Sequence, residues 1–313
     1  MVRHFRDVNP LPGLAGCQAL ICLTMALHPF ALRGADAPAA VRFRLAVSQA
    51  IIGADVNEGD ASLAMGAWRD AVVRQSGLLI DFSVDTLPQL VRAVREQRVD
   101  GFTLTTLEYV DVEKYASQAL MVDDRNMNGG DDYLLLVHQD SSIRSIAALR
   151  GKTVNIYDNP RMCLAEIWLE TLFAGANLGA PREFLGRLAS FNKLSRVVLP
   201  VYFRQADACL VTRRGFSTMC ELNPQLASKL RVVANSPKLI ASVMAFHRDF
   251  APEQRVRLQA ALTDLNKTVA GQQALTLFES SQLVVVDSSV LRPSLELIKA
   301  HERLRLKTEA VRK

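Results

Sequence analysis

Short apolar strands alternate with amphipathic helices along most of this chain, and this alternation limits the folds it can adopt. Residues 133–138 (YLLLVH) form the clearest strand, and residues 41–47 alternate apolar with polar or small side chains. Thr86 followed by Pro88 predicts a helix start, because a threonine cap and an early proline are typical there. This order predicts an α/β fold with mostly parallel sheets. About ten strands over roughly 250 residues suit two sheets better than one.

Ligands of open parallel sheets bind beyond the carboxyl ends of strands, where helices begin. Helix N-termini and hydroxyl groups can hold an anion there, because both donate hydrogen bonds. The first such junctions carry polar or aromatic side chains, which are Ser48, Gln49, Thr103, Thr105, Thr106 and Tyr109. Two alternatives stay open, namely that a threonine only caps its helix and that Tyr109 packs in the core.

A second junction follows the predicted strand 153–157 and has the sequence DNPRM at residues 158–162. Tyr157 ends the strand, Asn159 can donate through its amide, and Arg161 offers a two-pronged charged donor. The alternatives are that Asn159 caps the helix and that Arg161 faces solvent. We interpret this junction as the second half of an anion site.

The N-terminus predicts a secretory signal peptide covering residues 1–37. Arg3 and Arg6 precede an apolar stretch, which is followed by Ala35-Asp36-Ala37, a cleavage pattern of small residues; cleavage after Ala39 is the alternative. A membrane anchor is disfavoured, because the uninterrupted apolar part, residues 19–27, is shorter than the roughly 20 residues that span a bilayer. The expected location is therefore the periplasm.

Composition and motifs disfavour several other functions. The formal charge of +5 is spread along the chain without a long basic run, which argues against nucleic acid as a partner. The catalytic motifs GxSxG, HExxH, the P-loop and GxGxxG are missing, so we expect no enzyme, no cofactor and no metal site. Three cysteines follow the signal, namely Cys163, Cys209 and Cys220, so they cannot all pair in disulfides. We expect them to be small buried residues.

Four segments in order resemble the type 2 periplasmic solute-binding proteins of ABC transporters, in particular the phosphate, phosphite and phosphonate binders. The segments are residues 99–101 (VDG), 148–154 (ALRGKTV), 205–208 (QADA) and 231–237 (RVVANSP). The resemblance implies two lobes joined by a hinge of two crossovers near Asp131 and Ala234. It places residues 41–131 and 235–290 in lobe 1, residues 132–234 in lobe 2, and a C-terminal helix and tail at residues 291–313.

The same resemblance implies a small oxyanion ligand, delivered by a monomer to an ABC permease. A membrane sensor kinase or chemoreceptor is the alternative partner. The chain departs from the family at residues 158–162, where a Ser-Thr-Ser run is usual. It also lacks the two acids that grip a ligand ammonium in aminoalkylphosphonate binders, since Arg213 and Ser242 stand in those regions. Arg213 favours an anion if it faces the pocket, and a surface arginine is the alternative.

Overall fold

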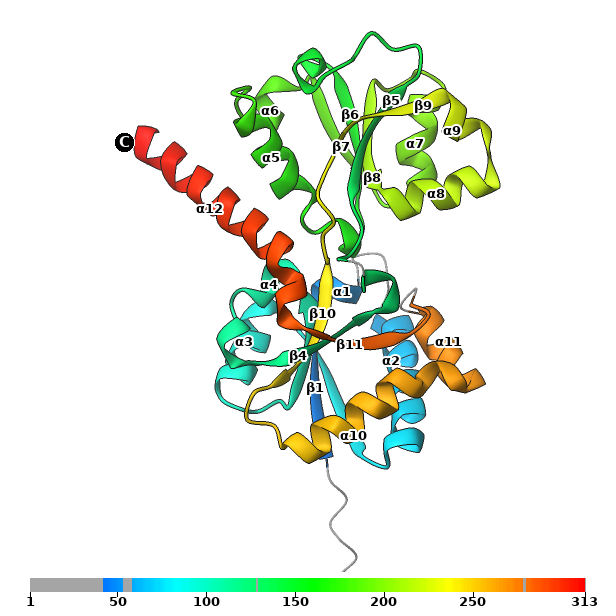
Figure 1. The fold of residues 1–313 in the computed structure, drawn as a ribbon, viewed down its shortest axis with the longest axis vertical. Coiled ribbons are helices and arrows are strands. Elements are labelled where there is room, and N and C mark those ends of the chain that lie inside the picture. The colour runs from blue at the N-terminus through cyan, green and yellow to red at the C-terminus, as the bar shows by residue number, and fades with distance from the viewer. Residues whose placement is uncertain (1–41, 53–57, 128, 278–279, 313) are drawn as a thin grey trace, which may run out of the picture. The chain divides into compact units, whose positions relative to one another are not determined.

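Two mixed sheets, each covered by helices on both faces, make up the protein (Figure 1). The computed structural model describes residues 42–52, 58–127, 129–277 and 280–312. The expected signal peptide lies outside these residues. Within them, no helix is long and apolar enough to cross a membrane. We call the six-stranded sheet with its helices lobe 1, and the five-stranded sheet with its helices lobe 2.

The sheet of lobe 1 has the strand order β11-β4-β10-β3-β1-β2. Its strands are β1 (Arg42–Ser48), β2 (Leu79–Asp85), β3 (Gly101–Thr105), β4 (Ala116–Asp123), β10 (Ser242–His247) and β11 (Leu283–Asp287). Strand β1 pairs in parallel with β2 and β3, whereas β10 runs antiparallel to β3 and β4. The carboxyl ends of β1 and β3 therefore meet the beginning of β10 at one edge of the sheet.

Helices bury an apolar core on each face of this sheet. One core holds Phe43 of β1 with Trp68 and Leu258 from the helices, and the other holds Leu90, Tyr109 and Phe102 of β3. The helices of lobe 1 are α1 (Gln49–Ile52), α2 (Glu58–Ser76), α3 (Leu87–Arg95), α4 (Thr106–Tyr109), α10 (Pro252–Thr263) and α11 (Val269–Leu277).

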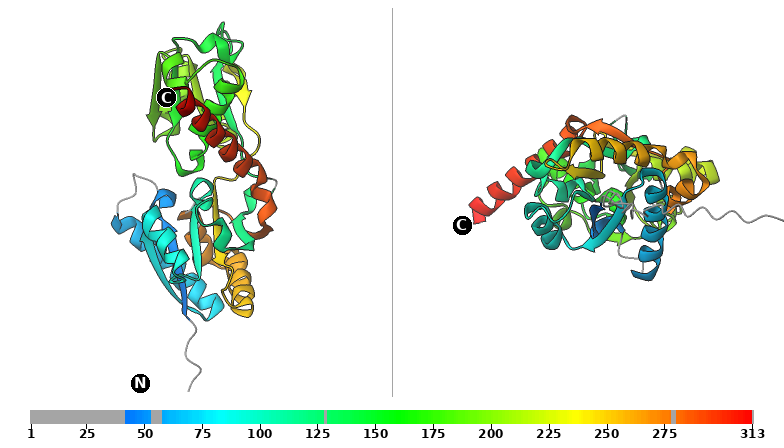
Figure 2. Two further views of the ribbon diagram at one scale, coloured as in Figure 1. Left: turned by 90° about the vertical axis from the view of Figure 1, so that its left-hand side faces the viewer. Right: turned by 90° about the horizontal axis from the view of Figure 1, so that it is seen from below.

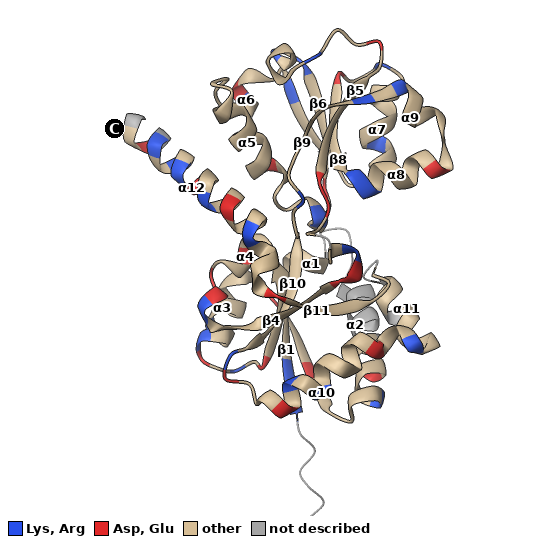
Figure 3. Cartoon of the chain, in the orientation of Figure 1, with Lys and Arg blue, Asp and Glu red and all other residues tan. Residues whose placement is uncertain are grey.

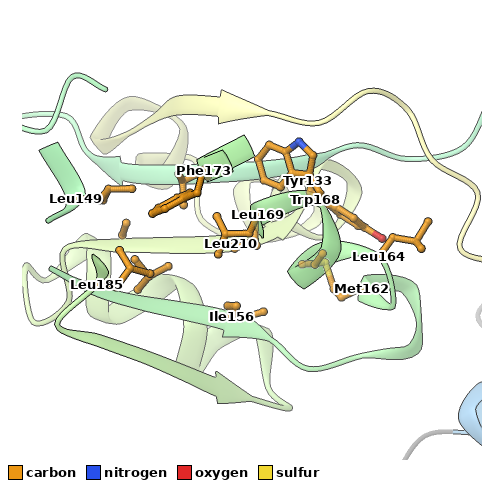
Figure 4. Packing of buried hydrophobic residues seen from close by; sticks show 14 of the residues in the cluster. Tyr133, Leu149, Ile156, Met162, Leu164, Trp168, Leu169, Phe173, Leu185 and Leu210 are labelled. Carbon is orange, nitrogen blue, oxygen red and sulfur yellow. The ribbon is translucent and has the colours of Figure 1, made fainter. Parts of the chain in front are cut away.

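The sheet of lobe 2 has the strand order β7-β6-β8-β5-β9. Its elements are β5 (Tyr133–His138), β6 (Thr153–Tyr157), α5 (Ala165–Gly175), α6 (Pro181–Phe184), β7 (Arg187–Phe191), α7 (Leu194–Tyr202), β8 (Ala208–Thr212), α8 (Arg213–Leu222), α9 (Gln225–Lys229) and β9 (Leu230–Asn235). Figure 4 shows Trp168, Leu169 and Phe173 of α5 packed over Leu210 and Ile156 of the sheet.

Short 3-10 turns and one long helix complete the described structure. The turns are η1 (Glu113–Tyr115), η2 (Asp124–Asn126), η3 (Ile146–Leu149), η4 (Pro160–Met162), η5 (Asp264–Lys267) and η6 (Ser288–Leu291), and the helix is α12 (Arg292–Arg312). Acidic and basic residues are interspersed along α12 (Figure 3).

Two segments connect the lobes (Figure 2). One leads from β4 into β5, and the other from β9 into β10. They pair with each other where the Asp131 N–H donates to the Leu239 carbonyl at 3.0 Å and the Leu239 N–H donates back at 2.8 Å. Gly130 has a φ of +99°, and a Cβ there would lie 2.0 Å from the Leu239 oxygen, so only glycine fits. The two-crossover hinge is thus a hydrogen-bonded pair of segments.

The sheets are less parallel than the sequence predicted. Antiparallel pairing is at least as common as parallel pairing in both sheets, because β10 and β5, which follow the crossovers, run against their neighbours. One strand of lobe 1, β4, was not predicted from the sequence.

Candidate functional site

The ends of β1, β3 and β10 bring the predicted side chains of lobe 1 together. Ser48 ends β1 and Gln49 begins α1. Thr105 ends β3 and lies directly opposite Ser242 of β10, while Thr103 lies opposite Val47 of β1. The residues predicted in lobe 1 therefore lie at one edge of one sheet.

A buried glutamate, which was not among the predicted site residues, organises this edge. Glu108 is 9% exposed, and its Oε1 accepts the Ser48 hydroxyl at 2.7 Å. Its Oε2 accepts the Thr105 N–H at 3.0 Å and the Thr105 hydroxyl at 2.9 Å. Thr105 and Glu108 form a capping box at the start of α4, a Thr-x-x-Glu pattern that could have revealed the interaction from the sequence.

Thr106 and Tyr109 are both buried next to this edge. The Thr106 hydroxyl donates to the Ile240 carbonyl at 2.6 Å, which ties α4 to the second crossover. Tyr109 is 2% exposed and packs in a core of lobe 1, and burial raises the pKa of its phenol to about 12. Both side chains therefore hold the edge of the sheet in place.

Three polar side chains remain available at this edge. Thr103 and Ser242 are half-buried, and Gln49 is exposed. Within the described residues none of their side chains has a hydrogen-bond partner in the chain. Because Ser242 is the cross-strand neighbour of Thr105, Thr103 lies diagonally across from it on the same face. These groups can donate to a ligand without breaking a bond in the protein.

The junction after β6 provides the matching half from lobe 2. Asn159 caps η4, since its Oδ1 accepts the Arg161 N–H at 3.0 Å, and its Nδ2 donates to the Tyr157 hydroxyl at 3.2 Å. The Tyr133 hydroxyl donates to the Arg161 carbonyl at 3.0 Å, which attaches the turn to the start of β5. Tyr157, Asn159 and Arg161 are all half-buried. The turn is therefore held by three hydrogen bonds and carries one guanidinium.

Helix α1 of lobe 1 lies against η4 of lobe 2, so the two halves of the site are neighbours. A second contact supports this arrangement, because the Cys163 thiol donates to the Ala241 carbonyl of the second crossover at 3.3 Å. Burial raises the pKa of Cys163 to about 12, which keeps the thiol protonated as a donor. Helix α1, which begins at Gln49, therefore lies beside the turn that holds Asn159 and Arg161.

Arg213 has a different environment from the other predicted residues. It begins α8 and forms a two-pronged ion pair with Asp132, with Nε to Oδ1 at 2.7 Å and Nη2 to Oδ2 at 2.6 Å. This hydrogen bonding raises the pKa of Arg213 above its ordinary value. Its charge is thus compensated at the point where the first crossover enters β5.

A surface hollow on lobe 2 is chemically unsuited to an anion. It has a volume of about 470 Å³ and lies among α8, α9 and β9. Its lining combines the apolar Leu134, Phe216, Ala227 and Val232 with Arg213, Ser217, Cys220 and Glu221, and the Arg213 guanidinium is already paired with Asp132. Because an oxyanion needs several converging donors, the junction between α1 and η4 remains the candidate site. No group of His, Cys, Asp or Glu side chains able to hold a metal occurs among the described residues.

Comparison with known proteins gives one family and a set of similar folds. The family described as "ABC transporter, phosphonate, periplasmic substrate-binding protein" matches residues 54–291. No curated protein matches the sequence. Among solved structures, a binding protein component of an ABC phosphonate transporter from Pseudomonas aeruginosa is 16% identical, with a TM-score of 0.55 over 84% of this chain and 87% of that one.

Two further structures have the same fold. XAC2383 from Xanthomonas citri bound to ATP is 16% identical, with a TM-score of 0.60 over 85% of this chain and 98% of that one. PhnD1 from Prochlorococcus marinus in complex with methylphosphonate is 13% identical, with a TM-score of 0.55 over 82% of this chain and 96% of that one. The TM-scores of the three structures show that they share this fold.

Proposed function

Since this chain belongs to the family of periplasmic substrate-binding proteins of ABC phosphonate transporters, we propose that it captures a small oxyanion between its lobes and delivers it to an ABC permease. The family consists of transport proteins and not of enzymes. The proposed ligand class is phosphate, phosphite or a small phosphonate. Closure of the lobes about the paired crossovers would enclose the ligand before its delivery to the permease.

One observation carries this proposal, namely the contact between α1 of lobe 1 and η4 of lobe 2. It brings together donors from both lobes. We propose that the ligand is contacted by side chains from the two strand-end junctions, which are Gln49, Thr103, Ser242, Tyr157, Asn159 and Arg161. Arg161 supplies the charge, because a guanidinium matches two oxygens of a phosphoryl group.

The preference for an oxyanion over an aminoalkyl ligand follows from the side chains of the hinge. Aminoalkylphosphonate binders of the family have an acid in each of two regions, where this chain has Arg213 and Ser242. Asp132 is close to that region, but its two carboxylate oxygens accept from Arg213. A ligand ammonium would therefore have to displace an arginine.

A thermal-shift panel tests the function. We expect phosphate, phosphite or methylphosphonate to raise the midpoint of unfolding, since a ligand at 100 times its Kd stabilises the folded state by about 2.7 kcal/mol. Arg161→Ala should abolish the shift. Arg182→Ala is the matched control, because Arg182 forms an exposed ion pair with Glu166 elsewhere in lobe 2. If no oxyanion stabilises the wild-type protein, the proposal fails.

We further propose that residues 1–37 direct export of the chain and that the mature protein acts as a monomer. Fractionation of expressing cells, with mass determination of the processed N-terminus, tests export. A periplasmic protein that starts at Pro38 or Ala40 would support export, whereas an intact Met1 in the cytoplasmic fraction would contradict it.

A further inference from the structure

A basic hollow lies on the surface of lobe 1, between the start of β4 and the start of α10. It has a volume of about 410 Å³ and is lined by residues 116–119 together with Arg248 and Arg255. Its described lining therefore supplies two guanidiniums, one side-chain amide and one hydroxyl, and it includes no carboxylate. Guanidiniums that converge without an acid favour the binding of an anion.

The strand register places this hollow far from the proposed oxyanion site. Strand β10 begins at Ser242, beside the proposed ligand contacts, and ends at His247, which pairs with Ala116 of β4. Arg248 follows directly. Because a strand of this length spans about 17–20 Å, the hollow is a separate place on lobe 1. Figure 1 shows the start of α10 at the same end of the lobe.

Arg255 provides a charge that the described part of the chain leaves without an ion pair. It is half-buried on α10, and its guanidinium has no hydrogen-bond partner among the described residues. Glu253 on the same helix is exposed and lies two residues away, a spacing at which side chains do not face each other. The exposed amide of Gln118 likewise has no partner there. Both groups can donate to a ligand without breaking a bond in the protein.

Arg248 is held in position but only weakly paired. Its Nη1 donates to the Lys114 carbonyl at 3.1 Å, and its backbone N–H donates to the Tyr115 carbonyl at 2.8 Å. The neighbouring acid is Asp249, whose Oδ1 lies 4.0 Å from the Arg248 Nε, and whose Oδ2 accepts the Gln97 amide at 3.0 Å. An exposed pair at this distance contributes little. The remaining donors of the Arg248 guanidinium are therefore available to a ligand.

The acid on the neighbouring strand is also engaged elsewhere. In the described sheet, β11 pairs with β4 only as far as Ala119, so residues 116–118 extend past the end of β11. Asp287 lies opposite Ala119, and its Oδ1 accepts the Ser289 N–H at 2.9 Å, which caps η6. The Ser117 hydroxyl donates to the Ala119 carbonyl at 2.9 Å. The donors open to a ligand are thus two guanidiniums and one amide.

We propose that this hollow binds a small polyanion that carries at least two carboxylate or phosphoryl groups. Each guanidinium can hold one such group by a two-pronged hydrogen bond, and the Gln118 amide adds a further donor. The volume of about 410 Å³ lies within the range of about 300–1,000 Å³ that is typical of small-molecule sites. This site is independent of the proposed function, because it shares no residue with the contacts between the lobes.

Calorimetric titration with citrate and with pyrophosphate tests the site and distinguishes carboxylate from phosphoryl groups. We expect at least one of the two probes to bind the wild-type protein. Arg248→Gln and Arg255→Gln should each weaken that binding by about tenfold or more, because each removes a charged hydrogen-bond donor. Arg257→Gln is the matched control and should bind as the wild type does, since Arg257 is exposed on α10 and two residues from Arg255.

The outcomes separate this site from the one between the lobes. Arg161→Ala should leave the binding of the probe unchanged. If neither probe binds the wild-type protein, the inference is overturned, whether or not an oxyanion binds between the lobes. Wild-type affinity in either Arg248→Gln or Arg255→Gln would also overturn it. So would a loss in Arg161→Ala, which would place the probe between the lobes, or an equal loss in Arg257→Gln, which would assign binding to net charge alone.

Discussion

Arg213 and Asp132 form a two-pronged ion pair at the entrance of lobe 2, and the register of the sheet sets it. Thr212 of β8 pairs with Tyr133 of β5, so the next residues outward, Arg213 and Asp132, are opposite each other. The Arg213 N–H also donates to the Asp132 carbonyl at 2.8 Å. The Asp132 side chain is 7% exposed, whereas that of Arg213 is 50% exposed. The pair therefore fixes the end of the first crossover.

Arg213→Ala should destabilise the protein, because it leaves the buried Asp132 carboxylate without its charged donor. We expect a loss of about 1–3 kcal/mol in the free energy of unfolding. The loss should be smaller than for a fully buried ion pair, because the guanidinium is half-exposed. Urea denaturation measures it. Combining the variant with Asp132→Asn should cost less than the sum of the two single changes. Full additivity would show that the two side chains do not interact.

Gly130→Ala should disrupt the pairing of the two crossovers. Its Cβ would overlap the Leu239 carbonyl, and its φ of +99° disfavours any side chain. We expect a loss of about 3 kcal/mol or more in stability. Gly129→Ala is the control for backbone strain alone, since Gly129 has a φ of +88° but its Cβ would come no closer than 3.8 Å to Lys238. Equal losses in the two variants would mean that the contact with Leu239 contributes nothing.

Strands with an apolar or alternating run of side chains were predicted from the sequence, whereas strand β4, which lacks such a run, was not. Tyr133–His138 has the predicted ends, because a continuous apolar run marks a buried strand. Strand β4 begins Ala-Ser-Gln, which has weak strand propensity. It is a strand because β10 and β11 pair with it on both sides, and such tertiary pairing leaves no periodic signal.

The location of the candidate site was predictable, but the direction of its hydrogen bonds was not. Polar residues at the ends of predicted strands placed Ser48 and Thr105 at one edge of a sheet. Whether their hydroxyls face a ligand depends on Glu108, whose capping pattern with Thr105 is visible in the sequence but whose contact with Ser48 is not. Its burial follows from the short α4 folding onto the ends of β1 and β3, and that is a property of the tertiary structure.

His138 should make the protein less stable in mild acid. Its Nδ1 accepts the Asp140 N–H at 3.2 Å, which requires a neutral ring. Burial, with repulsion from Arg204, holds the pKa of His138 below its ordinary value of 6.5. The folded state therefore binds this proton less readily than the unfolded state, and the stability from His138 is present above pH 6.5 and is lost as the pH falls below it.

His138→Asn tests this effect, because asparagine can accept the same N–H but does not titrate in this range. Urea denaturation at about pH 7.5 and at about pH 5 should show a smaller loss of stability for the variant than for the wild type. Identical losses would assign the acid sensitivity to other groups.

The C-terminal helix should stabilise the protein only through its first half. Ile298 is 3% exposed and belongs to the core of lobe 2 drawn in Figure 4, and His301 pairs with Glu170 of α5 at 2.6 Å. Ile298→Ala should therefore lower the free energy of unfolding by about 2–4 kcal/mol, because it leaves a cavity between α12 and α5. Leu306, on the same helix, is 66% exposed, so Leu306→Ala should change stability by less than about 0.5 kcal/mol. Equal effects in urea denaturation would mean that α12 does not pack on α5 in solution, and the helix would then be a free appendage of lobe 1.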